Sequence, residues 1–238
     1  MEPVDNPFAH VRAALFDLDG TLIQTEIDFD AMRRAMRQLA LRYGIRVDPT
    51  ERDVLAIVEE ARAALAREGD PAQAAALRKE AFAALEAIEE RHVRDAKVAP
   101  GAAALIRHLH RRSIRIGIVT RNCRRVSEQL VRMSRLPYDA LVTRDDVERT
   151  KPHPDHLMHT LRLLGMEHLH DGPAQAVIIG DHWMDIQAGR AAGLFTVGIL
   201  LGRDGSFFAP AMPDLLVNEL ADLLPLATQG GSAACLFP

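Results

Sequence analysis

The chain has 238 residues, of which 48% are hydrophobic and 26% charged, as in an ordinary globular protein with room for one substantial domain and a smaller one. A formal net charge of -4 and an isoelectric point near 6.2 give no support for nucleic-acid binding. Two cysteines cannot build a disulfide framework, and we recognise neither a signal peptide nor an apolar run long enough to cross a bilayer, so we expect a cytoplasmic protein that binds no membrane.

Short apolar, β-branched runs predict the strands of a parallel sheet. Four of them stand out, at residues 13–16, 114–119, 176–179 and 195–199, and a shorter run at 140–142 is expected to add another strand. Each of the four is bounded by Asp, Gly or Thr, and each later one follows a helical pattern. This alternation predicts an α/β fold in which helices cover both faces of the sheet.

Between the first strand and the helix predicted at residues 102–111, the chain carries a segment that is rich in Ala, Glu, Arg and Leu and lacks a convincing strand. Three helices are predicted there, over residues 28–43, 50–68 and 71–92. Asp28 is expected to cap the first helix, a capping box that begins at Thr50 the second, and Asp70-Pro71 to begin the third. The segment is therefore predicted to be an inserted, all-helical subdomain.

Polar residues follow three of the predicted strands. Asp17, Thr120 and Asp181 each come after the last apolar residues of their own run. Sites in parallel sheets gather at the carboxyl ends of the strands, which share one edge of the sheet. We therefore expect these three side chains to meet.

Asp17 and Asp19 flank Leu18 and are followed by Gly20-Thr21. Two carboxylates so close repel each other unless a cation or a shared proton intervenes, so the pair indicates a metal ion and an anionic substrate. Asp17 is the candidate nucleophile, because an ionised carboxylate can attack phosphorus and form an acyl phosphate. Asp19 could protonate the departing alkoxide and then activate water. An Asx turn at a strand end would explain only one Asp and the Gly.

Thr120-Arg121-Asn122 follows the second strand. A hydroxyl and free backbone N–H groups at the start of a helix suit phosphate oxygens, so these residues are candidates for substrate binding. An equally good interpretation is structural, with Asn122 merely capping the helix that begins at Cys123.

Lys151 precedes Pro152 on a loop that Pro154 also stiffens. An isolated lysine is usually a solvated surface charge. Here its ammonium would offset the negative charge that the aspartates and a phosphate concentrate, so we predict a catalytic role.

A second acidic cluster, Asp181 and Asp185, follows the strand predicted at 176–179. Carboxylate oxygens of this kind suit Mg²⁺. Asp181 is expected to be a direct ligand, and Asp185 could ligate through water or orient Lys151. An Asp that capped the next helix would explain one of the two acids and not both.

Taken in order, the four segments resemble the four motifs of the haloacid dehalogenase-like hydrolase superfamily: Asp17-Leu18-Asp19-Gly20-Thr21, Thr120, Lys151-Pro152, and Gly180-Asp181 with Asp185. Within it, the chain is similar to phosphoglycolate phosphatase-like members. The resemblance implies a Rossmann-like catalytic core at residues 1–23 and 98–227 with a small helical cap at 24–97, and we expect a flexible tail at 228–238. It also implies a phosphoaspartyl intermediate on Asp17 and Mg²⁺ held by Asp17, Asp181 and the main-chain carbonyl of Asp19.

The favoured function is hydrolysis of a phosphomonoester of a small metabolite, such as phosphoglycolate. A phosphosugar mutase would use the same intermediate, although Thr21 favours hydrolases by resemblance. Dehalogenation is disfavoured, because those relatives lack the acid that Asp19 supplies. A non-catalytic binding protein is a further alternative, which the joint presence of Asp17, Asp19, Lys151 and Asp181 argues against.

Two groups of side chains invite other interpretations. Three arginines of the first insert helix could include one that binds a substrate carboxylate, although exposed helix charges are commoner: Arg33, Arg34 and Arg37. Histidines spaced by three residues are interpreted as a solvated helix face, because no Cys joins them to make a zinc site: His153, His156 and His159, followed by His168 and His170.

Overall fold

The structure is a computed structural model that describes residues 6, 8, 10–166 and 175–228. The predicted flexible tail at 228–238 lies outside these residues except for Thr228, and so do His168 and His170. The chain divides into two compact units, one made of Met1–Thr25 and Ala96–Pro238 and the other of Glu26–Asp95.

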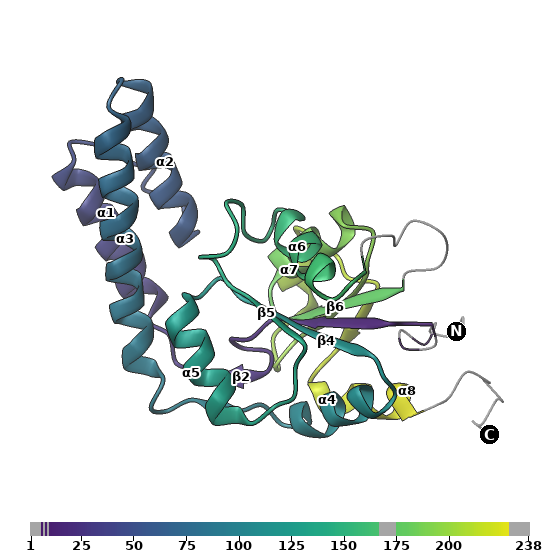
Figure 1. Cartoon of the computed structure of the whole chain (residues 1–238). Helices are drawn as coiled ribbons and strands as arrows, with labels where there is room; N and C mark the ends of the chain where they lie inside the picture. The colour runs from purple at the N-terminus through teal and green to yellow at the C-terminus, as the bar shows by residue number, and fades with distance from the viewer. Residues whose placement is uncertain (1–5, 7, 9, 167–174, 229–238) are drawn as a thin grey trace. The chain divides into compact units, whose positions relative to one another are not determined.

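The first unit is built on a six-stranded parallel sheet with the order β5-β4-β1-β6-β7-β8 (Figure 1). Its strands are β1 (Ala13–Phe16), β4 (Arg115–Val119), β5 (Ala140–Val142), β6 (Ala176–Gly180), β7 (Phe195–Ile199) and β8 (Leu215–Val217). β1 lies between β4 and β6, and its last residue, Phe16, pairs with Ile118 on one side and Ile179 on the other. The α/β prediction is confirmed.

Helices cover both faces of this sheet, with α6 and α7 on one face and α4 and α8 on the other (Figure 1). The helices of this unit are α4 (Ala102–Arg111), α5 (Arg124–Ser134), α6 (Asp155–Leu163), α7 (Trp183–Ala191) and α8 (Leu224–Thr228), with 3-10 turns at Gly205–Phe208 and Leu220–Leu223. All four residues of β1 are fully buried, as expected for a central strand covered on both sides.

Three strands of the first unit are not predicted by the sequence pattern. β8 has only three half-buried residues, which is too short a run to stand out. β2 (Ile23–Gln24) and β3 (Lys97–Val98) form a two-residue antiparallel pair where the chain leaves for the second unit and returns from it.

The second unit consists of α1 (Phe29–Arg42), α2 (Val54–Arg67) and α3 (Pro71–His92), which share one apolar core. Asp28 and Asp70 cap α1 and α3 as predicted, since their carboxylates accept hydrogen bonds from backbone N–H groups of the first turn. The prediction of a capping box at Thr50 is wrong. Asp53 caps α2, and the Thr50 hydroxyl donates to Asp48 instead.

The histidines in and just before α6 do not form one solvated face. His153 and His159 are partly exposed, but His156 is fully buried, so that interpretation is wrong for His156. None of the helices in the described part of the chain combines the length and the apolar character that crossing a bilayer requires.

Candidate active site

Three carboxylates meet at the carboxyl edge of the parallel sheet. Asp17 follows β1, and Asp181 and Asp185 follow the adjacent strand β6. One oxygen of each side chain can be chosen so that all three lie within 4.8 Å of one another. Within the described residues this is the one group of acidic, histidine or cysteine side chains placed to hold a metal ion, and its donor set of oxygens alone fits Mg²⁺.

Lys151 lies beneath this cluster as a buried cation. Its Nζ is 2.7 Å from Oδ1 of Asp17, 2.6 Å from Oδ1 of Asp185 and 2.8 Å from the carbonyl oxygen of Val119. The side chain is only 2% exposed, so a solvated surface role is excluded. Burial by itself would lower the pKa of Lys151, but the two carboxylates outweigh it and raise the pKa above its usual value. Lys151 therefore carries its charge at neutral pH.

The acids themselves are held in an unfavourable electrostatic setting. Burial raises the pKa of Asp17 well above its usual value, Lys151 opposes this shift, and the charges of Asp185 and Asp181 add to it. Burial and the charge of Asp185 likewise raise the pKa of Asp181, against the lowering effect of Arg203. A divalent cation among these oxygens would relieve the repulsion and favour the ionised carboxylates.

Asp19 is held by the residues that the sequence assigns to phosphate binding. Thr120 Oγ1 and Asn122 Nδ2 donate to Oδ2 of Asp19, at 3.3 Å and 2.6 Å, and Thr25 Oγ1 donates to Oδ1 at 3.1 Å. The interpretation of Asn122 as a mere helix cap is wrong, because Cys123 occupies the cap position of α5. Thr120 therefore contacts the second aspartate of the first motif, Asp19.

Arg121 extends toward the first turn of α7. Its Nη1 lies 2.6 Å from Sδ of Met184, and its carbonyl oxygen accepts a hydrogen bond from Arg144. Its side chain thus lies between the second and fourth motifs. Asp185 uses one oxygen for Lys151 and the other for the backbone N–H of His182, the residue that caps α7.

Two glycines permit this crowding. Gly20 has φ +86°, and a Cβ there would lie 2.6 Å from Oδ2 of Asp181. A Cβ at Gly180 would lie 2.2 Å from Oδ2 of Asp185. Neither contact distance is possible for a real Cβ, so any side chain at either position would displace a carboxylate of the cluster.

Three further residues contact the site although the sequence pattern predicts no catalytic or binding role for them. Thr21 Oγ1 donates to Oδ1 of Asp181 at 3.1 Å, and Arg203 donates to the same residue from 22 positions further along the chain. His156 Nδ1 accepts a hydrogen bond from the backbone N–H of Lys151. Thr21 could have been noticed because it belongs to the first motif, whereas nothing in the local sequence marks Arg203 or His156.

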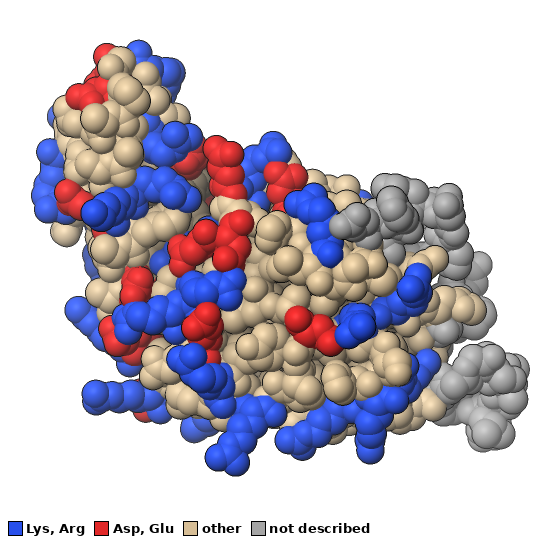
Figure 2. All heavy atoms as spheres, in the orientation of Figure 1, with Lys and Arg blue, Asp and Glu red and all other residues tan. Residues whose placement is uncertain are grey.

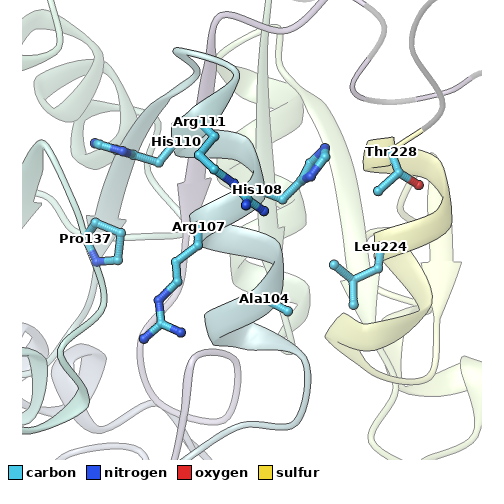
Figure 3. Close-up of a pocket in the computed structure, with 8 residues that line it drawn as sticks. All are labelled: Ala104, Arg107, His108, His110, Arg111, Pro137, Leu224 and Thr228. Carbon is cyan, nitrogen blue, oxygen red and sulfur yellow. The ribbon is translucent and has the colours of Figure 1, made fainter.

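A groove of about 540 Å³ elsewhere on the first unit contains none of the motif residues. It is lined by Ala104, Arg107, His108, His110, Arg111, Pro137, Leu224 and Thr228 (Figure 3). His108 points toward α8, where its Nε2 lies 3.0 Å from the carbonyl oxygen of Ala227. Figure 2 shows Lys and Arg side chains gathered along the edge of the molecule where Figure 1 places α4. None of its lining residues in the described part of the chain carries a carboxylate, so the candidate active site is the acidic cluster.

Comparisons with known proteins identify the family of the chain. The profile of the family described as "Haloacid dehalogenase-like hydrolase" matches residues 14–199, which include every motif residue. A pyrophosphatase PpaX of Bacillus cereus strain AH820 is 35% identical over 124 residues, which are 51% of this chain and 55% of that protein. The match thus spans about half the length of this curated relative.

Two solved structures have similar folds over most of the chain. CbbY from Rhodobacter sphaeroides, in complex with phosphate, is 26% identical with a TM-score of 0.60, and the match covers 91% of this chain and 99% of that one. A phosphonoacetaldehyde hydrolase-like protein from Oleispira antarctica has a TM-score of 0.65 at 18% identity, with 92% of each chain covered. Since the family profile matches well over half of the sequence, this chain belongs to the haloacid dehalogenase-like hydrolases.

Proposed function

We propose that this protein is a Mg²⁺-dependent phosphatase that cleaves small phosphomonoesters through a phosphoaspartyl intermediate on Asp17. The observation that carries the proposal is the Asp17 carboxylate, held by the buried ammonium of Lys151 beside two further carboxylates. The family of the chain and its similarity to a pyrophosphatase support the reaction class.

In the first half of the proposed reaction, an oxygen of Asp17 attacks phosphorus and the ester oxygen leaves with the bonding electron pair. Asp19 gives its proton to that oxygen. In the second half, Asp19 takes a proton from water, the water oxygen attacks phosphorus, and inorganic phosphate leaves Asp17 as a free carboxylate. Lys151 offsets the charge of Asp17 and Asp185 throughout.

The metal would be held by Asp17, Asp181 and the main-chain carbonyl of Asp19. When bound, Mg²⁺ offsets the charge that the carboxylates and the phosphate bring together. We propose that Asp185 acts behind these ligands, through water or by orienting Lys151, whose Nζ lies 2.6 Å from Oδ1 of Asp185. Thr120, Arg121 and Asn122 are proposed to bind the transferred phosphate once Asp19 turns toward the substrate.

The helical unit is proposed to be the cap that selects the substrate. Two of the three arginines considered for this role are engaged within the unit: Arg33 donates to the carbonyl oxygen of Arg52, and Arg37 donates to that of Pro49. The Arg34 side chain is 65% exposed and its ion pair with Asp28 is long, at 4.0 Å, so Arg34 is the candidate that remains.

A phosphate-release screen with Mg²⁺ tests the proposal. The panel contains 2-phosphoglycolate, sugar phosphates, nucleotides and inorganic pyrophosphate, the last because of the relative named a pyrophosphatase. We expect release from at least one compound, and loss of that release in Asp17→Asn. Transfer of phosphate from a hexose 1-phosphate to sugar would favour a mutase, and no turnover of any compound would favour a binding protein.

A further inference from the structure

Arg203 binds Asp181 at two points. One of its terminal nitrogens, Nη2, lies 2.7 Å from the carbonyl oxygen of Asp181 and 2.9 Å from its Oδ2. The same guanidinium group therefore contacts the backbone and the carboxylate of one residue. This double contact restricts the side-chain rotation of Asp181 relative to its own backbone.

The guanidinium of Arg203 is itself held by two further contacts. Its Nε donates to the carbonyl oxygen of Leu200 at 3.0 Å, and its Cζ lies over the ring of Phe207, 4.2 Å from the ring centre. The loop that carries it is tied to the chain after β8, where Asn218 accepts hydrogen bonds from the backbone N–H groups of Leu201 and Gly202. Arg203 thus connects the chain segments that follow β7 and β8 to Asp181, which follows β6.

The charge of Arg203 also matters to the cluster. Its guanidinium forms an ion pair with Asp181, whereas Lys151 contacts the other two acids. Three converging carboxylates therefore face two cations, each bound to a different part of the cluster. Without Arg203, the Asp181 carboxylate would lose its ion pair and keep the hydrogen bond from Thr21, so it would be held less firmly in the cluster.

We propose that Arg203 is a positioning residue that holds Asp181 ready to bind the metal ion. This inference rests on the proposed function only in taking Asp181 as a metal ligand. A group behind a metal ligand typically changes metal affinity by about 10–100-fold when removed, because it orients the ligand. An arginine charge near the ion would have the opposite effect if repulsion dominated, so the sign of the change in affinity decides between the two.

The test measures ion binding directly, with Mn²⁺ as the probe and its EPR signal as the readout. Arg203→Gln removes the charge and the double contact, and Arg203→Lys keeps the charge but loses the planar fork. The matched control is Arg115→Gln, which breaks another arginine–aspartate pair on the same sheet, with Asp139 at 3.0 Å. Circular dichroism and thermal melting of each variant confirm folding.

We expect Mn²⁺ binding about 10–100-fold weaker in Arg203→Gln, an intermediate loss in Arg203→Lys, and no change in Arg115→Gln. We also expect saturating Mg²⁺ to restore most of the phosphate release of Arg203→Gln, with the substrate KM unchanged. If Arg203→Gln does not fold, Phe207→Leu is measured in its place. This substitution removes the ring that packs against the Arg203 guanidinium, so its Mn²⁺ binding should also weaken.

Unchanged or tighter Mn²⁺ binding in the folded variants would overturn the inference while leaving the proposed function intact. If the wild type binds Mn²⁺ and Arg203→Gln binds it more weakly, but no phosphate ester is hydrolysed, the inference stands and the proposed function fails. A wild type that binds no Mn²⁺ contradicts the inference.

Discussion

Nζ of Lys151 lies 2.7 Å from Oδ1 of Asp17, although 134 residues separate them in the chain. The contact is made where β1 and the loop before α6 meet, and it joins a buried cation to the candidate nucleophile. The same ammonium contacts Asp185, so one side chain balances two acids.

Removing the ammonium should destabilise the protein as well as inactivate it. Lys151→Met leaves the carboxylates of Asp17 and Asp185 buried without their cation, which typically costs about 3–5 kcal/mol. Urea denaturation without Mg²⁺ measures this loss in the free energy of unfolding. Lys79→Met, at an exposed position of α3, is the control and should change stability by less than about 0.5 kcal/mol. Equal stability of the two variants would contradict the account.

Added Mg²⁺ should stabilise the protein more at pH 8 than at pH 4.5. The pKa of Asp17 and that of Asp181 are raised in the folded protein, so the metal-free fold holds these protons more tightly than the unfolded chain. Its stability therefore falls as pH rises from about 4 through the raised pKa values. Mg²⁺ binds the ionised acids and removes this loss. Thermal melting with and without MgCl₂ measures the difference, which should vanish in Asp17→Asn with Asp181→Asn.

His156 should make the protein sensitive to mild acid. Burial lowers the pKa of His156 to about 3, so below pH 6.5 the unfolded chain takes up a proton that the folded one refuses. Between pH 6.5 and pH 5 the free energy of unfolding therefore falls by about 2 kcal/mol, since each pH unit contributes about 1.4 kcal/mol. His156→Leu should lose this share of the acid sensitivity, as followed by urea denaturation at pH 7 and pH 5. His110→Leu, at an exposed position of α4, should keep the whole of it.

Adding one methyl group at Gly180 should disturb the site. The new Cβ would lie 2.2 Å from Oδ2 of Asp185, so Gly180→Ala must push that carboxylate away from Lys151. We expect a loss of about 1–3 kcal/mol in the free energy of unfolding, together with reduced phosphate release. Gly205→Ala is the control, because the nearest atom to its Cβ would be 3.8 Å away. A Gly180→Ala protein with full activity would show that the crowding has no role.

The sequence predicts those parts of the fold whose signals are local. Asp28 and Asp70 mark helix starts because the carboxylate and the N–H groups that it caps lie within three residues. Thr50 misleads for the same reason, since a cap pattern does not reveal that its hydroxyl is used by a neighbouring turn. The order of the motifs predicts the meeting of the acids, because strand ends of a parallel sheet share one edge. Arg203 could not be predicted, because only the packing of β7 against β6 and β8 brings it to Asp181.

The central claim is that Asp17 carries the phosphoryl group, and chemical trapping tests it most directly. Turnover of a substrate found in the phosphate-release screen is quenched with acid, and the protein is treated with borohydride, which reduces an acyl phosphate to an alcohol. Mass spectrometry of the peptide that contains position 17 should then show homoserine there, only when substrate was present. Rapid phosphate release with position 17 unmodified, or with the label on another residue, would contradict the account.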